Sequence, residues 1–221
     1  MPYKRENGKF VTDGTTIYFN DTETHTFHAY YPYQSDGGTV TVSTAADKQG
    51  ADIDFLFASG ATGDTHNPTV SFTGDHAFHH CMSLIKFTFK AGDGLSFNET
   101  EPAGYTLEGL KHEGTFDTAT GTTAVTAASE SPITMQLGGA TTSQVIILPQ
   151  EVTSSLNLKV SYNGQSYNAQ LKLPATPTAN FYTAGYAYTY NITLNNKDIE
   201  VSDPTINPWE SGDSNDASAE L

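Results

Sequence analysis

The stretch from Ala184 to Leu194 constrains the fold of this chain more than any other. Its large side chains all fall on one parity, with small and polar residues between them, and their types favour strands: Tyr186, Tyr188, Tyr190, Ile192 and Leu194. A period of two predicts a β-strand with one buried face. Because that face needs a cover, the rest of the chain must supply a second sheet that packs against it.

A second local pattern fixes a hairpin. Asn163-Gly164 accepts the positive φ angles of a tight two-residue turn between strands. Taking these two residues as the turn sets apolar residues opposite one another: Val160 with Tyr167, Leu158 with Ala169 and Leu156 with Leu171. A shift of one residue would place apolar side chains opposite polar ones, so the turn and the pattern predict the same register.

Short alternating runs that stop at Gly, Pro or Asn indicate further strands along the chain. They cover residues 15–19, 24–31, 39–43, 52–58, 69–73, 83–91, 105–110, 114–116, 133–137, 144–148 and 198–202. Residues 117–131 contain no large side chain and predict a surface loop. The small, acidic end from residue 211 onward predicts disorder. Because no segment has a helical period, the sequence predicts an all-β fold.

Charge and composition narrow the functional classes. The chain has 25 acidic and 10 basic residues and a formal net charge of -15, so it would repel a nucleic acid backbone. No apolar run approaches the roughly 18 residues of a membrane-spanning helix. Cys81 is the single cysteine and predicts a buried free thiol.

The sequence lacks a recognisable catalytic or metal-binding arrangement, and we expect neither catalytic residues nor a cofactor. His76 and His80 would share a face of a helix, but on a strand they lie about 13 Å apart, too far for one ion. Asp52 and Asp54 share a parity, which a glycosidase could use, but a solvent-facing strand gives the same pattern. Two alternatives remain open: a carbohydrate-binding sandwich that presents Trp209, and a glycosidase.

Seven motifs in order along the chain resemble the fimbrillin-like pilins of type V fimbriae. They are NGKF with IYF and FHAYYPY at residues 7–33, DFLFA at 54–58, HHCMSLIKFTFKAGDG at 79–94, ILPQ at 147–150, YNGQSY at 162–167, AGYAYTYNITL at 184–194 and INPW at 206–209. The resemblance implies a secreted lipoprotein precursor, located at the cell surface or outer membrane, that forms part of a fimbria. Arg5 could be a processing site, but its position just before NGKF argues against this.

The resemblance also implies two transthyretin-like antiparallel β-sandwich domains, over residues 1–74 and 75–196. The first would be incomplete, because family members normally carry a signal peptide, a lipobox cysteine and further strands before the NGKF motif. Residues 197–221 are the candidate donor strand in assembly by strand exchange. The residues expected to anchor it in the groove of a neighbouring subunit are Ile199, Val201, Ile206 and Trp209. The expected partners are other fimbrial subunits and a host or bacterial surface ligand.

Overall fold

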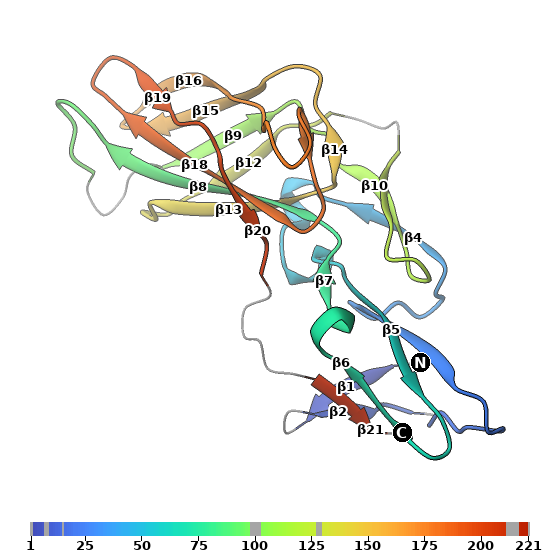
Figure 1. The fold of residues 1–221 in the computed structure, drawn as a ribbon. Helices are drawn as coiled ribbons and strands as arrows, with labels where there is room; N and C mark the ends of the chain where they lie inside the picture. The colour runs from blue at the N-terminus through green and yellow to red at the C-terminus, as the bar shows by residue number, and fades with distance from the viewer. Residues whose placement is uncertain are drawn as a thin grey trace.

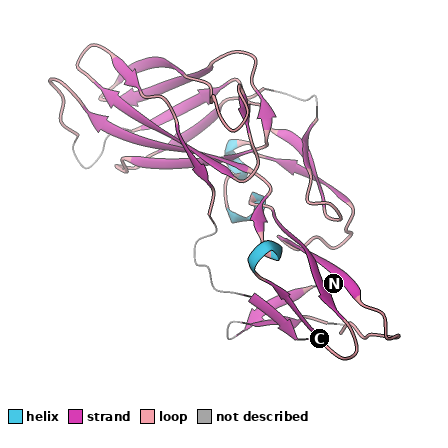
Figure 2. Ribbon diagram, viewed as in Figure 1, coloured by secondary structure: helices cyan, strands magenta, loops and turns pink. Residues whose placement is uncertain are grey.

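The fold is all-β, as the periodicity predicts (Figure 1). The structure is a computed structural model that describes residues 2–6, 9–14, 16–97, 103–126, 130–210 and 217–220. Within these ranges no α-helix occurs, and Figure 2 shows strands as the dominant element. Short turns of 3-10 helix interrupt the strands at η1 (Ala46–Lys48), η2 (Ala51–Ile53) and η3 (Gly74–His76).

The larger part of the molecule is a sandwich of two sheets (Figure 1). The first sheet has the order β13 (Thr142–Ile147), β8 (Ser83–Ala91), β18 (Tyr186–Leu194) and β19 (Ile199–Val201). In that sheet β20 (Thr205–Pro208) also pairs with β18. The second sheet has the order β12 (Ile133–Gln136), β9 (Gly104–Glu108), β15 (Leu156–Tyr162) and β16 (Gln165–Leu171).

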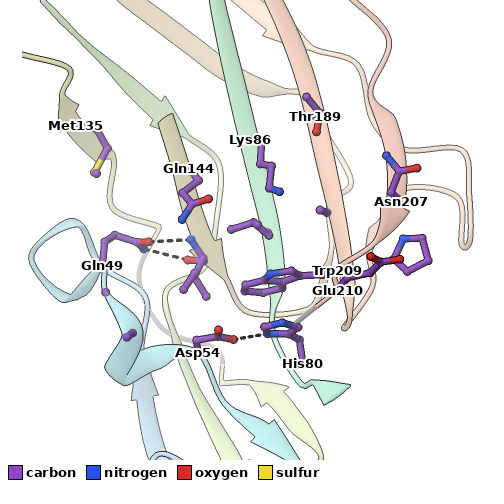
Figure 3. Close-up of a pocket in the computed structure, with 16 residues that line it drawn as sticks. Gln49, Asp54, His80, Lys86, Met135, Gln144, Thr189, Asn207, Trp209 and Glu210 are labelled. Carbon is purple, nitrogen blue, oxygen red and sulfur yellow. Dashed lines mark hydrogen bonds and ion pairs between the residues drawn. The ribbon is translucent and has the colours of Figure 1, made fainter. Parts of the chain in front are cut away.

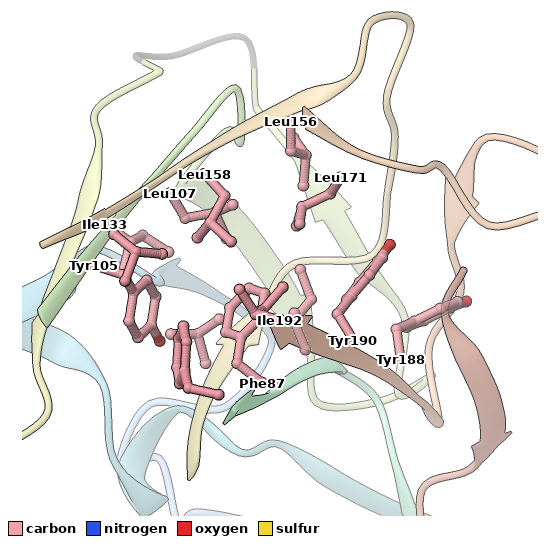
Figure 4. Close-up of a cluster of buried hydrophobic side chains, with 14 of the residues drawn as sticks. Phe87, Tyr105, Leu107, Ile133, Leu156, Leu158, Leu171, Tyr188, Tyr190 and Ile192 are labelled. Carbon is pink, nitrogen blue, oxygen red and sulfur yellow. The ribbon is translucent and has the colours of Figure 1, made fainter. Parts of the chain in front are cut away.

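Side chains of one parity from each sheet meet in the core of this sandwich (Figure 4). Tyr188 and Tyr190 are fully buried, as the period of two in β18 predicts. The rings of Phe87 and Tyr105, one from each sheet, have centroids 5.0 Å apart. Each buried phenol also needs a hydrogen-bond partner, and the Tyr190 hydroxyl donates to the Lys172 carbonyl oxygen at 2.8 Å. The tyrosines of β18 therefore have a structural role in the core.

The predicted hairpin register is confirmed. β15 and β16 are antiparallel, with Leu156 opposite Leu171 and Leu158 opposite Ala169. The turn residues Asn163 and Gly164 have φ angles of 46° and 71°, which is the left-handed region that this turn requires.

The centre of the first sheet departs from the antiparallel expectation. β18 runs parallel to β8, with Ala187 opposite Leu84 and Leu194 opposite Ala91. Between these two strands the chain crosses to the facing sheet and returns in the same direction, which a parallel pair requires. On the other side of β18, β19 and β20 turn back and pair with it antiparallel.

Smaller sheets lie at one end of the sandwich. One has the order β11 (Thr123–Val125), β10 (Glu113–Asp117) and β4 (Thr39–Ser43), and another pairs β14 (Gln150–Glu151) with β17 (Phe181–Tyr182). The prediction of a surface loop over residues 117–131 is therefore wrong for β11. That strand is held by backbone pairing with β10 and needs no large side chain. Residues 127–129 lie outside the described residues.

The N-terminal part contains two further sheets (Figure 1). One has the order β3 (His25–Tyr31), β5 (Leu56–Gly63) and β7 (His79–His80). The other has the order β1 (Tyr3–Glu6), β2 (Lys9–Thr12), β21 (Ala217–Glu220) and β6 (Thr69–Phe72). A strand from the far end of the chain thus lies between two strands from its beginning.

Three further expectations need correction in this part. Residues 16–19 form no strand, and Phe19 instead packs its ring against Phe27 with centroids 6.0 Å apart. The strand expected at residues 52–58 begins later, at Leu56, because η2 occupies the start of that range. Residues 217–220, expected to be disordered, form β21, while 211–216 and 221 lie outside the described residues.

A second apolar cluster joins the two parts of the chain. Val42 and Phe57 pack with Leu84 and Leu148, which follow the predicted boundary at residue 75. In addition, β4 pairs with β10 across that boundary. The division into residues 1–74 and 75–196 stays a prediction.

Candidate functional site

The outer face of the first sheet carries two rows of side chains that run across neighbouring strands. They have the parity opposite to the core residues, so they point away from the sandwich. The first row is Gln144, Lys86 and Thr189, and the second row is Ile146, Leu84, Ala187 and Asn207. The first row is polar and the second is mainly apolar.

A cleft of about 840 Å³ lies over these rows (Figure 3). The segment from Gln49 to Ala51, together with Asp54 and His80, lines one part of it. The end of β20 lines another part with Pro208, Trp209 and Glu210. A concave volume of this size, lined by apolar groups and a few polar ones, has the dimensions of a small-molecule site.

An aromatic stack holds Trp209 in place. The rings of His80 and Trp209 are parallel, with centroids 3.8 Å apart and planes 5° apart. His80 is 6% exposed, and its Nδ1 lies 2.7 Å from Asp54 Oδ1, so an Nδ1–H donates to this carboxylate. The Trp209 backbone N–H donates to the Gly185 carbonyl oxygen at 2.7 Å. Asp54 thus orients His80, and His80 with Gly185 orients the indole.

Lys86 supplies the positive charge in the cleft. Its side chain is half-buried, and among the described residues no carboxylate lies within ion-pair distance of its ammonium. Asp54 is engaged by His80, and Glu210 is exposed.

The Gln49 side chain forms hydrogen bonds with the backbone of the edge strand β13, beside the cleft. Its Nε2 donates to the carbonyl oxygens of Thr44 at 2.8 Å and Ile146 at 3.0 Å. Its Oε1 accepts from the Ile146 N–H at 2.8 Å. Gln49 therefore occupies the backbone groups that an incoming strand would use at this point.

The four residues expected to act as donor anchors pack within their own subunit. Ile199, Val201 and Ile206 are partly buried against the larger core. Trp209 is partly buried against the second cluster and lines the cleft. β19 and β20, which carry the first three, lie on the open side of β18.

The histidines considered in the sequence are not brought together. His76 Nδ1 lies 2.9 Å from the Ser59 carbonyl oxygen, whereas His80 bonds to Asp54. Asp52 is exposed in η2 and does not form a pair with Asp54. Across the described residues, no group of three or more His, Cys, Asp or Glu side chains has the geometry of a metal site.

Cys81 is buried beside the cleft, as the sequence predicts for a free thiol. Burial, with a smaller contribution from the charge of Asp54, raises the pKa of its thiol to about 12. The protonated thiol is a poor nucleophile at neutral pH.

The sequence did not indicate that these residues form a cleft. The parity of residues 83–91 does place Lys86 on the outer face, but the sequence gives no sign of what lies above that face. Asp54, His80 and Trp209 come from distant points in the chain, and only the fold brings them together.

The described part of the chain contains no helix long and apolar enough to cross a membrane. Comparison with known proteins identifies a likeness over almost the whole chain. A family model described as fimbrillin-like matches residues 1–209. No curated protein sequence matches the chain.

Two solved structures are similar in both sequence and fold. A candidate cell adhesion protein from Bacteroides uniformis ATCC 8492 is 27% identical with a TM-score of 0.76, and the match covers 91% of this chain and 80% of that chain. A candidate cell adhesion protein from Bacteroides ovatus ATCC 8483 is also 27% identical, with a TM-score of 0.72 and coverage of 92% and 76%.

Proposed function

This chain belongs to the fimbrillin-like family, and from that premise we propose that it is a structural subunit of a bacterial surface fimbria, or an adhesin attached to one, that assembles by strand exchange. The family match agrees with the resemblance found in the sequence motifs. Similarity to two candidate cell adhesion proteins supports a place at the cell surface. The partners would be other fimbrial subunits.

The observation that carries the proposal is the position of β21. It lies inside the N-terminal sheet, parallel to β2 on one side and antiparallel to β6 on the other. If this strand left, β2 and β6 would both expose unpaired backbone groups, which form a template for another strand. The same strand from a neighbouring subunit would satisfy both edges.

The rest of the tail, like β21, consists of strands that another copy of the chain could supply. β19 and β20 pair only with β18 in the described sheet order, and Ile199, Val201 and Ile206 on these strands pack against the core. Contacts that a segment makes within its own subunit are the ones that it makes in a neighbour after an exchange. We therefore keep Ile199, Val201, Ile206 and Trp209 as the proposed anchors of a donor segment over residues 197–221.

An engineered disulfide can test whether β21 pairs with β6 of its own subunit or with β6 of a neighbouring subunit. Ser71 and Ser218 are directly opposite in the register of β6 and β21, a spacing that a disulfide can bridge. We expect the double variant Ser71→Cys with Ser218→Cys, oxidised after heating and cooling at high concentration, to form covalent dimers and longer chains on a gel without reductant. Oxidation of a dilute, unheated sample should instead give a cross-linked monomer.

The control is each single variant, which can form at most a dimer through one new thiol, because Cys81 is buried. If the double variant gives only cross-linked monomers at every concentration, the tail is a fixed part of its own subunit and strand exchange is the wrong mechanism. Substitution of Val201 by Asp would weaken assembly too. However, Val201 is partly buried, so this change also destabilises the monomer and is the less specific test.

A further inference from the structure

The lining of the cleft over the first sheet has the chemistry of a ligand site. We propose that it binds a short oligosaccharide bearing one carboxylate sugar, with Lys86 opposite that carboxylate. This goes beyond the proposed assembly role and does not depend on it.

The floor of the cleft provides a line of hydrogen-bonding groups. Gln144, Lys86 and Thr189 lie directly opposite one another on three neighbouring strands. Each backbone is therefore about 4.8 Å from the next one across the sheet. At this spacing, the Lys86 ammonium can donate hydrogen bonds to a hydroxyl group of a sugar. The Gln144 amide and the Thr189 hydroxyl can donate to or accept from neighbouring hydroxyl groups. Asn207 adds a second amide from β20.

Trp209 provides the apolar part of the site. Figure 3 shows His80 on one side of the indole and Lys86 and Thr189 on the other. The stack on His80 fixes the indole before a ligand arrives, so binding does not have to order this side chain. A fixed aromatic ring beside polar groups suits a sugar, which has both C–H surfaces and hydroxyl groups.

The charge of Lys86 specifies an acidic sugar. Partial burial of an ammonium without a carboxylate partner is unfavourable, and a carboxylate on the ligand would offset that cost. A polyanion is a poor fit because the protein has a net charge of -15. A single carboxylate mainly senses the charges within a Debye length of about 8 Å at physiological ionic strength. The charged groups that line the cleft are Lys86, Asp54, which is hydrogen-bonded to His80, and Glu210, which is exposed.

A peptide strand fits the cleft less well than a glycan. Strand addition needs a free sheet edge, and Gln49 already bonds to both backbone groups of Ile146 on the edge strand β13. Beneath the cleft, β8 and β18 are paired on both sides, and β20 pairs with β18.

The test is a titration of the monomeric protein, residues 1–221, with two pairs of glycans. One pair is sialyllactose and lactose, and the other is a glucuronic acid disaccharide and its neutral glucose counterpart. Because Trp209 is the only tryptophan, its fluorescence reports on the cleft, and calorimetry measures the affinity independently. We expect at least one acidic glycan to bind about tenfold more tightly than its neutral partner, which corresponds to about 1.4 kcal/mol.

Lys86→Met should remove this preference, because it keeps most of the side-chain volume but loses the charge. Lys90→Met is the matched control, since Lys90 has the same parity on the same strand but is exposed and outside the cleft. Thermal unfolding of both variants checks that they are folded. The proposal is wrong if neither acidic glycan binds, if the neutral glycans bind equally well, or if Lys86→Met keeps the preference.

This outcome is separable from that of the disulfide test. Trp209 and Glu210 come with whichever tail occupies the subunit, so the cleft is complete in the monomer and after an exchange. Loss of glycan binding would leave assembly intact, and a failure of strand exchange would leave the cleft intact.

Discussion

Raising the pH should unfold this protein through its buried tyrosines and its cysteine. Burial raises the pKa of Tyr105 and of Tyr190 to about 12, and it raises the pKa of Tyr182 well above the ordinary value of 10.0. Above about pH 10 the unfolded chain releases phenol protons that the folded protein retains. The contribution of the tyrosines to stability is therefore complete below about pH 10 and is lost as the pH rises towards 12.

The size of the effect follows from the number of groups. Each buried tyrosine loses about 1.4 kcal/mol of stability per pH unit in this window, so three lose about 4 kcal/mol by about pH 11. Cys81 starts to contribute earlier, because burial raises its thiol pKa from 9.0 to about 12. It adds about 3 kcal/mol by about pH 11, and the total approaches the whole stability of a typical domain.

Urea unfolding followed by circular dichroism, at several pH values between about 8 and 11, measures the effect. Tyr105→Phe should make the loss shallower by about 1.4 kcal/mol per pH unit above pH 10, although losing the bond to Ser143 lowers stability at neutral pH. Tyr33→Phe is the control, because Tyr33 is 50% exposed. A constant free energy of unfolding up to about pH 11, or the same slope in Tyr105→Phe as in the unmodified protein, would refute the reasoning.

Substitutions at three positions test the packing and the hydrogen bonds elsewhere in the fold. Leu158→Ala, at a position 1% exposed in the core, should lower the free energy of unfolding in urea by about 2–5 kcal/mol. Gly121→Ala should also destabilise the protein and lower its melting temperature, because the added Cβ would clash with the Phe57 ring and the φ of this residue is 71°. Gln49→Ala should cost about 1–3 kcal/mol by leaving the Ile146 backbone groups unpaired, whereas Gln49→Glu should keep the accepted bond and lose the donated ones. A cost near zero for any of the three changes would contradict the contacts described.

The sequence alone was sufficient for two features that depend on local pattern. The buried parity of Tyr188 and Tyr190, and the register around Asn163-Gly164, follow from side-chain alternation and turn geometry within a few residues. The family resemblance also rested on short motifs, and the match over residues 1–209 confirms it.

Features that depend on distant contacts were not predictable in the same way. β11 has only small side chains and is held by the backbone of β10, so no apolar pattern marks it. The parallel pairing of β8 with β18 depends on the path of the intervening chain. The stack of His80 on Trp209 joins two residues that appear unrelated in the sequence, so the sequence did not indicate the cleft.

The parallel pair at the centre of the sandwich also limits when this protein can fold. Leu84 lies beside Ala187, about a hundred residues further along the chain, so the first sheet cannot form until most of the polypeptide has been synthesised. Pairings over such distances fold slowly and leave apolar strands exposed in the meantime. A chain of this topology therefore has a long interval in which it is incompletely folded and needs protection from aggregation.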